Sequence, residues 1–276
     1  MKPNYAPLRH KIVYFALTGL SLSILLLLPP QGYGESQDTK GPNSPDSFSK
    51  PSSVPSSGEP APAPSLPPSG NTPIEQTGPD EYRIGKLMLN KKTREIAITG
   101  QVNMQSGLVE YLACCSAEAG KLHESVLKLD TKPSDVQVAL LLLGAKAENN
   151  LKFQGDPNPP KGDPLEIWVE WELQDKTKKK VRGEELVYNQ AEKKPMGKTT
   201  WAFTGSFIRE GRFVADMEGS IIATFRDPAA LINNSLPVGA DDTQIFSNEN
   251  LLPPVGTKVT LFIKPVPNHS PEKHSL

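Results

Sequence analysis

The chain has 276 residues and a formal net charge of −1. Over residues 81–266, 24 basic and 24 acidic side chains cancel, which argues against the net basic face that nucleic-acid binding requires. The chain has two cysteines, too few for an iron–sulfur cluster held by four thiolates. We therefore predict no nucleic-acid partner and no cofactor.

The N-terminal 34 residues have the organisation of a secretory signal. Basic residues precede an apolar run over residues 12–28, and small residues occupy positions −3 and −1 of a cleavage site between Gly34 and Glu35. This order predicts a signal peptide over residues 1–34 and an exported protein, periplasmic or extracellular. The run of 17 residues is short for a membrane span, which needs about 20. A membrane tether through residues 12–28 is therefore the alternative.

Residues 35–80 have a different composition, with 11 prolines and 10 serines among 46 residues. Such a segment buries too little apolar surface to offset the entropy cost of folding, so we expect a disordered linker that acts as a flexible stalk. The globular domain is predicted over residues 81–266, and residues 267–276 are predicted to be a disordered tail.

The first clear strand of the domain lies in the run "REIAITGQVNM", residues 94–104. Apolar residues occupy alternate positions in this run, the pattern of a half-buried strand. Gly100 interrupts the side-chain pattern and indicates a bulge or a close backbone contact.

The two cysteines are adjacent and are soon followed by a histidine and a glutamate. Cys114, Cys115, His123 and Glu124 are therefore the candidate redox or metal-binding residues. In a regular strand, however, successive side chains point to opposite faces, so the two thiols cannot bind one ion. A disulfide between them would be strained, because adjacent Cα atoms lie about 3.8 Å apart and disulfides need roughly 4.4 to 6.8 Å.

A hairpin would bring one of these cysteines to the histidine. If residues 117–120 form its loop, Cys114 lies opposite His123, with Cβ atoms about 4.5 to 5.5 Å apart. Cys114, His123 and the nearby Ser125 are then the catalytic candidates, with the thiolate activated by imidazole. A two-residue loop would place Cys114 opposite Ser125 instead. The interpretation we favour is structural, an inert buried cysteine and a core histidine.

A buried helix is predicted at about residues 133–143. Pro133 suits the first helical turn, Asp135 favours the positive end of the helix dipole, and Gly144 can end the helix. Because the run is apolar nearly all round, we expect this helix to pack against a sheet.

The rest of the domain contains more strands and one short helix. The alternation over residues 165–173 gives one apolar face and one mostly charged face, as in an antiparallel sheet with one solvated side. A short helix is predicted at 227–233 after an Asp cap. This pattern predicts an α+β domain with a mainly antiparallel β-sheet. Further strand-like runs cover 184–188, 200–208, 212–216, 220–225 and 258–264.

Acidic and amide side chains gather near the predicted second helix, at Asp227, Asn233, Asn234, Asp241 and Asp242. Their oxygens could bind a hard cation, but the spacing is not that of an EF-hand loop. The same residue types favour turns, so we predict loops here and no metal site.

Three segments carry a family resemblance: "GLVEYLACC" and "GKLHESVLKLDTKPSDVQVALLLLGA" within residues 107–145, "DPAALINNS" at 227–235, and "DDTQIFSNENLLPPVGTKVTLFIKP" at 241–265. Together they resemble the YdjY-type domain of exported bacterial proteins, over residues 82–265. The resemblance implies an exported domain and brings no established reaction with it.

We expect a non-enzymatic binding or interaction module on a flexible stalk in the cell envelope. Its partner would be an unknown envelope protein or a small ligand, with membrane contact only through an uncleaved N-terminal segment. An enzyme is less favoured, because the sequence has no P-loop, nucleophile elbow or zinc-protease motif. The alternative is a periplasmic thiol-redox or metal-handling protein that uses Cys114, Cys115 and His123.

Overall fold

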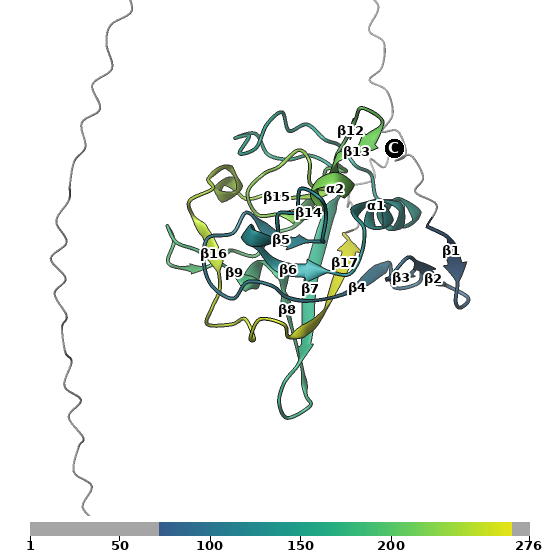
Figure 1. The fold of residues 1–276 in the computed structure, drawn as a ribbon, viewed down its shortest axis with the longest axis horizontal. Helices are drawn as coiled ribbons and strands as arrows, with labels where there is room; N and C mark the ends of the chain where they lie inside the picture. Colours follow the sequence, from purple (N-terminus) through teal and green to yellow (C-terminus); the bar gives the residue numbers. More distant parts are fainter. Residues whose placement is uncertain (1–71, 267–276) are drawn as a thin grey trace, which may run out of the picture. The chain divides into compact units, whose positions relative to one another are not determined.

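The computed structural model describes residues 72–266. Within this range, eight strands follow one another through hydrogen-bonded pairs, and the last pairs back with the first to close a barrel (Figure 1). Closure leaves the strands of the ring without free edges. In order around the barrel they are β4 (Glu95–Val102), β17 (Lys258–Pro265), β7 (Pro164–Glu172), β11 (Trp201–Phe203), β15 (Ile232–Asn234), β14 (Ser220–Ala223), β5 (Tyr111–Cys114) and β6 (Ser125–Leu129).

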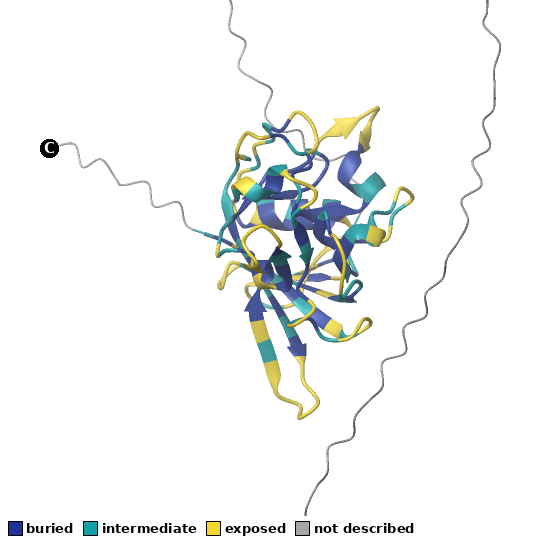
Figure 2. Cartoon of the chain, turned by 90° about the vertical axis from the view of Figure 1, so that its left-hand side faces the viewer, coloured by how far each residue is buried: buried dark blue, intermediate teal, exposed yellow. Residues whose placement is uncertain are grey.

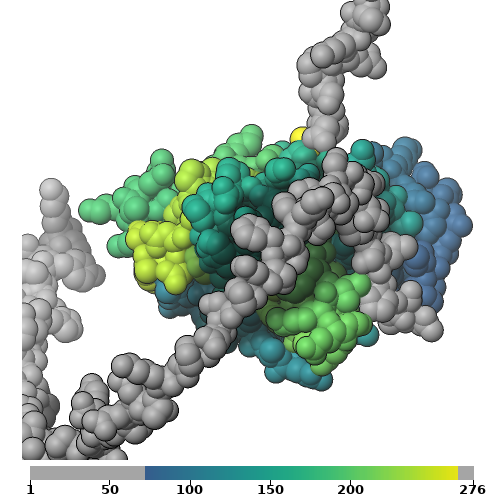
Figure 3. Space-filling model, turned by 90° about the horizontal axis from the view of Figure 1, so that it is seen from above, coloured from purple at the N-terminus to yellow at the C-terminus, as the bar shows by residue number. Residues whose placement is uncertain are grey.

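Three strands extend the sheet from β4: β3 (Leu87–Asn90), β2 (Glu81–Ile84) and β1 (Ile74–Gln76). From above, this extension is the blue end of the domain, and the yellow-green segment lies toward the other end (Figure 3). The strand β1 lies inside the predicted linker, 35–80, and pairs with β2. The predicted domain boundary at residue 81 is therefore too late, because main-chain hydrogen bonds join a preceding segment to the sheet.

Shorter strands complete the described domain. Strand β8 (Lys178–Arg182) pairs with β7 in a projecting hairpin. A small sheet contains β10 (Lys194–Pro195), β9 (Val187–Asn189) and β16 (Ile245–Ser247), and β12 (Ile208–Arg209) pairs with β13 (Arg212–Phe213).

The barrel is mixed. Strands β5 and β6 are parallel, as are β14 and β15, whereas the other strand pairs of residues 72–266 are antiparallel. The prediction of a β-rich domain with few helices is confirmed. Each parallel pair needs a crossover connection, which a purely antiparallel arrangement of hairpins would not contain.

The core fills the barrel as the alternating patterns predict. Ile96 and Ile98 of β4 and Ile167 of β7 are fully buried, and Figure 2 colours much of the strand ribbon in the domain interior as buried. Gly100 lies where β4 meets β6, and a Cβ there would be 2.5 Å from the Lys128 carbonyl oxygen. The close backbone contact predicted for this glycine is confirmed.

The predicted first helix is confirmed as α1 (Pro133–Leu142). It begins with proline, and Gly144 follows its end with a φ of +78°, a conformation that glycine adopts at little cost. Val136, Ala139 and Leu140 of this helix are buried in the core.

The predicted second helix, 227–233, is wrong. The first half of this run is a turn, in which the Asp227 carboxylate accepts a hydrogen bond from the Ala229 amide at 2.8 Å. The second half is strand β15. The structure forms α2 (Val214–Glu218) instead, which begins within the run 212–216 that we predicted to be a strand. Of that run, only Arg212–Phe213 is a strand, β13. The predicted strand 184–188 is divided between the 3-10 helix η2 (Gly183–Leu186) and β9.

The predicted signal or anchor (1–34), most of the linker and the C-terminal tail (267–276) lie outside the described residues. Between residues 72 and 266, no helix has both the length and the apolar character needed to cross a membrane.

Candidate functional site

The hairpin that would pair Cys114 with His123 is wrong. Strands β5 and β6 are parallel, and the Cα partner of Cys114 is Lys128. The chain crosses between the two strands through residues 115–121 and the 3-10 helix η1 (Leu122–Glu124). His123 lies on this helix with 75% of its side chain exposed, 3.6 Å from the Glu124 carboxylate.

The crossing loop takes its hydrogen-bond partners from a distant segment. The Cys115 amide donates to the Gly219 carbonyl at 2.9 Å, and the Ala119 amide donates to the Met217 carbonyl at 3.3 Å. Because these partners belong to α2 and the residue after it, the loop packs beside α2 and does not fold back on β5. This packing is the physical reason for the parallel arrangement.

The two cysteines are free and lie in different surroundings. Cys114 is fully buried and packs with Tyr111, Ala223 and Ala230. Burial raises the pKa of its thiol to about 12, although a hydrogen bond with Ser125 opposes the shift. A thiol with this pKa is protonated at neutral pH and is a poor nucleophile.

Cys115 belongs to the main core and is 5% exposed. Burial and the negative charge of Asp216 raise the pKa of this thiol to about 11. Over residues 72–266, no group of three or more histidine, cysteine, aspartate or glutamate side chains is arranged to hold a metal ion.

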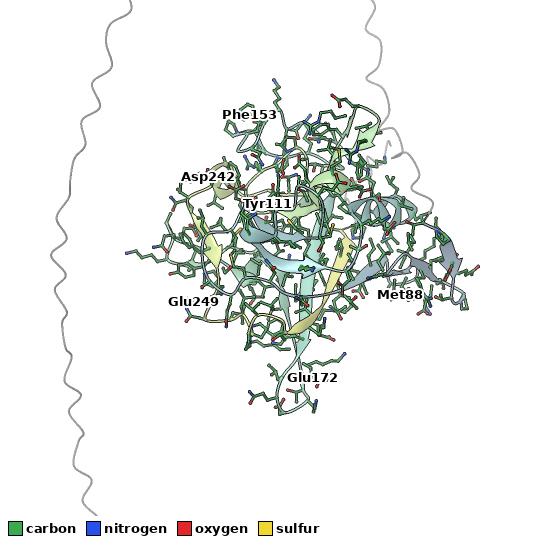
Figure 4. All side chains as sticks on the ribbon, viewed as in Figure 1. Met88, Tyr111, Phe153, Glu172, Asp242 and Glu249 are labelled. Carbon is green, nitrogen blue, oxygen red and sulfur yellow. The ribbon has the colours of Figure 1, made fainter. Side chains whose placement is uncertain are left out.

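A buried polar network that the sequence patterns did not reveal lies beside Cys114. The Tyr111 hydroxyl donates to the Asp227 carboxylate at 2.5 Å, and the Lys121 ammonium donates to both, at 2.6 and 3.1 Å. Lys121 also pairs with Glu218 at 2.8 Å. Figure 4 shows Tyr111 near the middle of the domain. No fixed spacing links residues so far apart, so sequence reasoning had no signal for this network.

The network holds one cation, Lys121, between two carboxylates, Asp227 and Glu218. Burial and the Asp227 charge raise the pKa of the Tyr111 hydroxyl, so it remains a neutral donor. Burial favours neutral Lys121, but its contacts with Asp227 and Glu218 outweigh burial and raise the pKa of its ammonium group. Each group has a partner, so the network joins β5, the crossing loop and the 227–230 turn without offering a free base or nucleophile.

The loops predicted at Asn233 and Asn234 are wrong, because both residues lie in strand β15. The Asn233 side chain donates to the Thr204 hydroxyl and the Asp227 carbonyl, both at 2.9 Å. The Asn234 side chain donates to the Thr224 carbonyl at 3.0 Å. Both amides are fully buried and hold neighbouring backbone segments together.

An open pocket of about 580 Å³ lies beside Cys115. It is bounded by the turn between β2 and β3, the ends of β5 and β6, and the start of α1. Its lining includes five charged side chains: Lys86, Lys128, Lys132, Asp130 and Asp135. The pocket therefore combines a surface opening with three cationic side chains.

The fold and the site define a mixed β-barrel domain with one closed polar network and a lysine-lined pocket. The family model of the YdjY domain matches residues 87–264. The chain therefore belongs to the YdjY domain family, which confirms the resemblance seen in its sequence. No curated protein and no solved structure matches the chain.

Proposed function

We propose that the protein is an exported, non-enzymatic binding module of the cell envelope, carried on a flexible stalk, which binds a ligand in the pocket beside Cys115. The proposal includes export through residues 1–34 and a linker upstream of β1. It also includes the finer classification as an α+β domain of mainly antiparallel type.

The single observation that supports the proposal most is the set of lysines in the pocket. Within the described residues, Lys86, Lys128 and Lys132 make no ion pair. Lys86 and Lys132 are exposed, and Lys128 is half-buried. Ammonium groups that make no direct ion pair are available to an anionic ligand, such as a carboxylate or a phosphate. The Lys132 charge also acts on the Asp135 carboxyl group.

The aspartates of the pocket only partly offset this positive charge. Asp135 is 6% exposed, and burial raises the pKa of its carboxyl group. Three lysines face two aspartates in the lining. The lining favours an anion over a cation.

The thiol-redox alternative has less support. Cys115 lines the pocket, but its raised pKa of about 11 leaves little thiolate at neutral pH. Cys114 is fully buried, and His123 points to solvent on the 3-10 helix.

Binding of simple anions to the full chain tests the proposal. We expect citrate and inorganic phosphate to raise the melting temperature, and Lys86→Ala, Lys128→Ala and Lys132→Ala each to weaken binding by about threefold to tenfold. Lys146→Ala is the matched control, because Lys146 is exposed outside the pocket. Binding that is absent, or that the three pocket variants leave unchanged, would contradict the proposal.

Export is tested separately by sequencing the N-terminus of the protein recovered from an expressing bacterium. We expect the mature chain to begin at Glu35 and to fractionate outside the cytoplasm. A chain that keeps residues 12–28 and fractionates with membranes would support the anchor instead.

A further inference from the structure

The lysine-lined pocket continues along the outside of the barrel. A second hollow of about 400 Å³ shares Asp130 with the pocket. A third hollow of about 670 Å³ shares Trp171 and Glu172 with the second. We refer to these three adjoining hollows, from the start of α1 to the β7–β8 hairpin, as the groove.

Strand register gives the course of this groove. Lys128 of β6 pairs with Gln101 of β4, and Gln101 pairs with Lys258 of β17. One strand further, Glu172 of β7 pairs with Lys178 of β8. The groove thus crosses five adjacent strands, β6, β4, β17, β7 and β8. With about 4.8 Å between strands, the crossing spans about 19 Å, the length of about six extended residues.

The two ends of the groove differ in charge. The end at α1 carries the unpaired Lys86 and Lys132. The opposite end carries Asp175, and Glu172 paired with Lys176 at 2.8 Å, beside the apolar Leu173, and Leu173 is 40% exposed. Glu172 is labelled on the hairpin in Figure 4. A complementary ligand therefore carries negative charge at one end and an apolar and a basic group at the other.

The groove lining suits a peptide better than a glycan. Protein sites stack aromatic side chains on ring-shaped ligands through an open ring face. The one aromatic ring in the second and third hollows belongs to Trp171, which is 3% exposed and has the Lys179 ammonium 5.7 Å from its ring centroid. Thr99 and Thr260 in the second hollow offer hydroxyl groups to a peptide main chain.

We infer that the groove binds an extended peptide segment of about six residues, with acidic residues at the Lys86 and Lys132 end and an apolar and a basic residue at the Leu173 end. This inference rests on the proposed function, because it uses the same pocket as one end of the groove. It adds the class of partner and the length of the contact.

The test compares peptides of two lengths on the full chain by calorimetry. The probes are the blocked hexapeptide Glu-Glu-Thr-Thr-Leu-Lys and the blocked dipeptide Glu-Glu. We expect the hexapeptide to bind at least about tenfold more tightly than the dipeptide. Replacing its final lysine by glutamate should remove most of this gain, because Glu172 and Asp175 would then face a like charge.

A blocking variant locates the contact. Thr99 is exposed on β4 in the second hollow, so Thr99→Trp should abolish the gain of the hexapeptide and leave dipeptide binding unchanged. Lys264→Trp, at an exposed position of β17 outside the groove, is the matched control and should change neither affinity.

The outcomes separate the two proposals. If neither peptide binds, or if the lysine-to-alanine variants of the pocket leave binding unchanged, the proposed function fails. If the dipeptide binds through the pocket lysines but length adds nothing, only the extended groove fails. Tighter binding of a six-unit N-acetylglucosamine oligosaccharide than of the hexapeptide, lost in Thr99→Trp, would overturn the peptide assignment in favour of a glycan.

Discussion

The Tyr111 hydroxyl lies 2.5 Å from the Asp227 carboxylate although the two residues are 116 positions apart in the chain. Lys121 donates to both groups, so one buried network joins β5, the crossing loop and the 227–230 turn. A charge-assisted hydrogen bond in a buried site is stronger than one exposed to water.

Removal of the Tyr111 hydroxyl should therefore destabilise the fold. Tyr111→Phe removes a donor to a buried carboxylate, and we expect the free energy of unfolding to fall by about 1–3 kcal/mol. Denaturant unfolding of the full chain measures this loss. Tyr82→Phe is the matched control, because Tyr82 lies at a half-buried position on β2 and its hydroxyl makes no hydrogen bond within residues 72–266. Equal losses in both variants would show that the network is not a source of stability.

A second prediction concerns Gly162, where a Cβ would lie in contact with the Phe203 carbonyl group. Its φ is +106°, so alanine would be strained and would also displace the backbone. We expect Gly162→Ala to cost about 3 kcal/mol or more. At Gly211 the φ is +73° with no atom within 4 Å of a Cβ, so Gly211→Ala should cost only about 1 kcal/mol. Similar melting temperatures for both variants would contradict the packing argument.

Sequence reasoning succeeded where local pattern decides the structure. The alternation in β7 and the proline and glycine signals of α1 are properties of a few consecutive residues. The alternation of side chains therefore sufficed to predict β7, and the residues that begin and end the helix sufficed to predict α1.

Hydrogen-bond partners that are far apart in the chain could not be predicted in this way. The residues 115–121 have turn-like composition, but their hydrogen bonds go to Met217 and Gly219 near α2. The same limitation affects the 227–233 run, where Asp227 binds Tyr111 and Lys121 and the following residues enter the barrel. The pocket lysines come from separate elements, so no spacing pattern in the sequence predicts the pocket.

The thiols give a third prediction. Relative to an ordinary pKa of 9.0, the raised value of about 11 for Cys115 lowers its thiolate fraction at pH 7 by about a hundredfold. We expect native Cys115 to alkylate at least this much more slowly than a free cysteine, and Cys114 to react only after unfolding. Mass spectrometry of maleimide-treated Cys114→Ser and Cys115→Ser variants assigns each rate. Rapid labelling of Cys114 in the folded protein would instead support the hypothesis that Cys114 is a nucleophile.

The last prediction uses the half-buried Glu110. Burial, followed by the charges of Glu124 and Asp242, raises the pKa of its carboxyl group from the ordinary 4.5. The folded state therefore holds this proton more tightly than the unfolded state, and its stabilising effect, complete below about pH 4.5, is lost as pH rises through the folded pKa. Charged Glu110 thus opposes folding at neutral pH.

Glu110→Gln should raise the free energy of unfolding at pH 7, and the difference from the parent chain should vanish near pH 4. Because the side chain is partly exposed, solvent screening limits the gain to less than about 1 kcal/mol. Unfolding curves collected from pH 4 to pH 8 measure the dependence. Glu249→Gln serves as control at an exposed position and should give a difference near zero throughout. A gain from Glu110→Gln that is equally large at pH 4 would show that amide packing, and not the removal of a charge, is its cause.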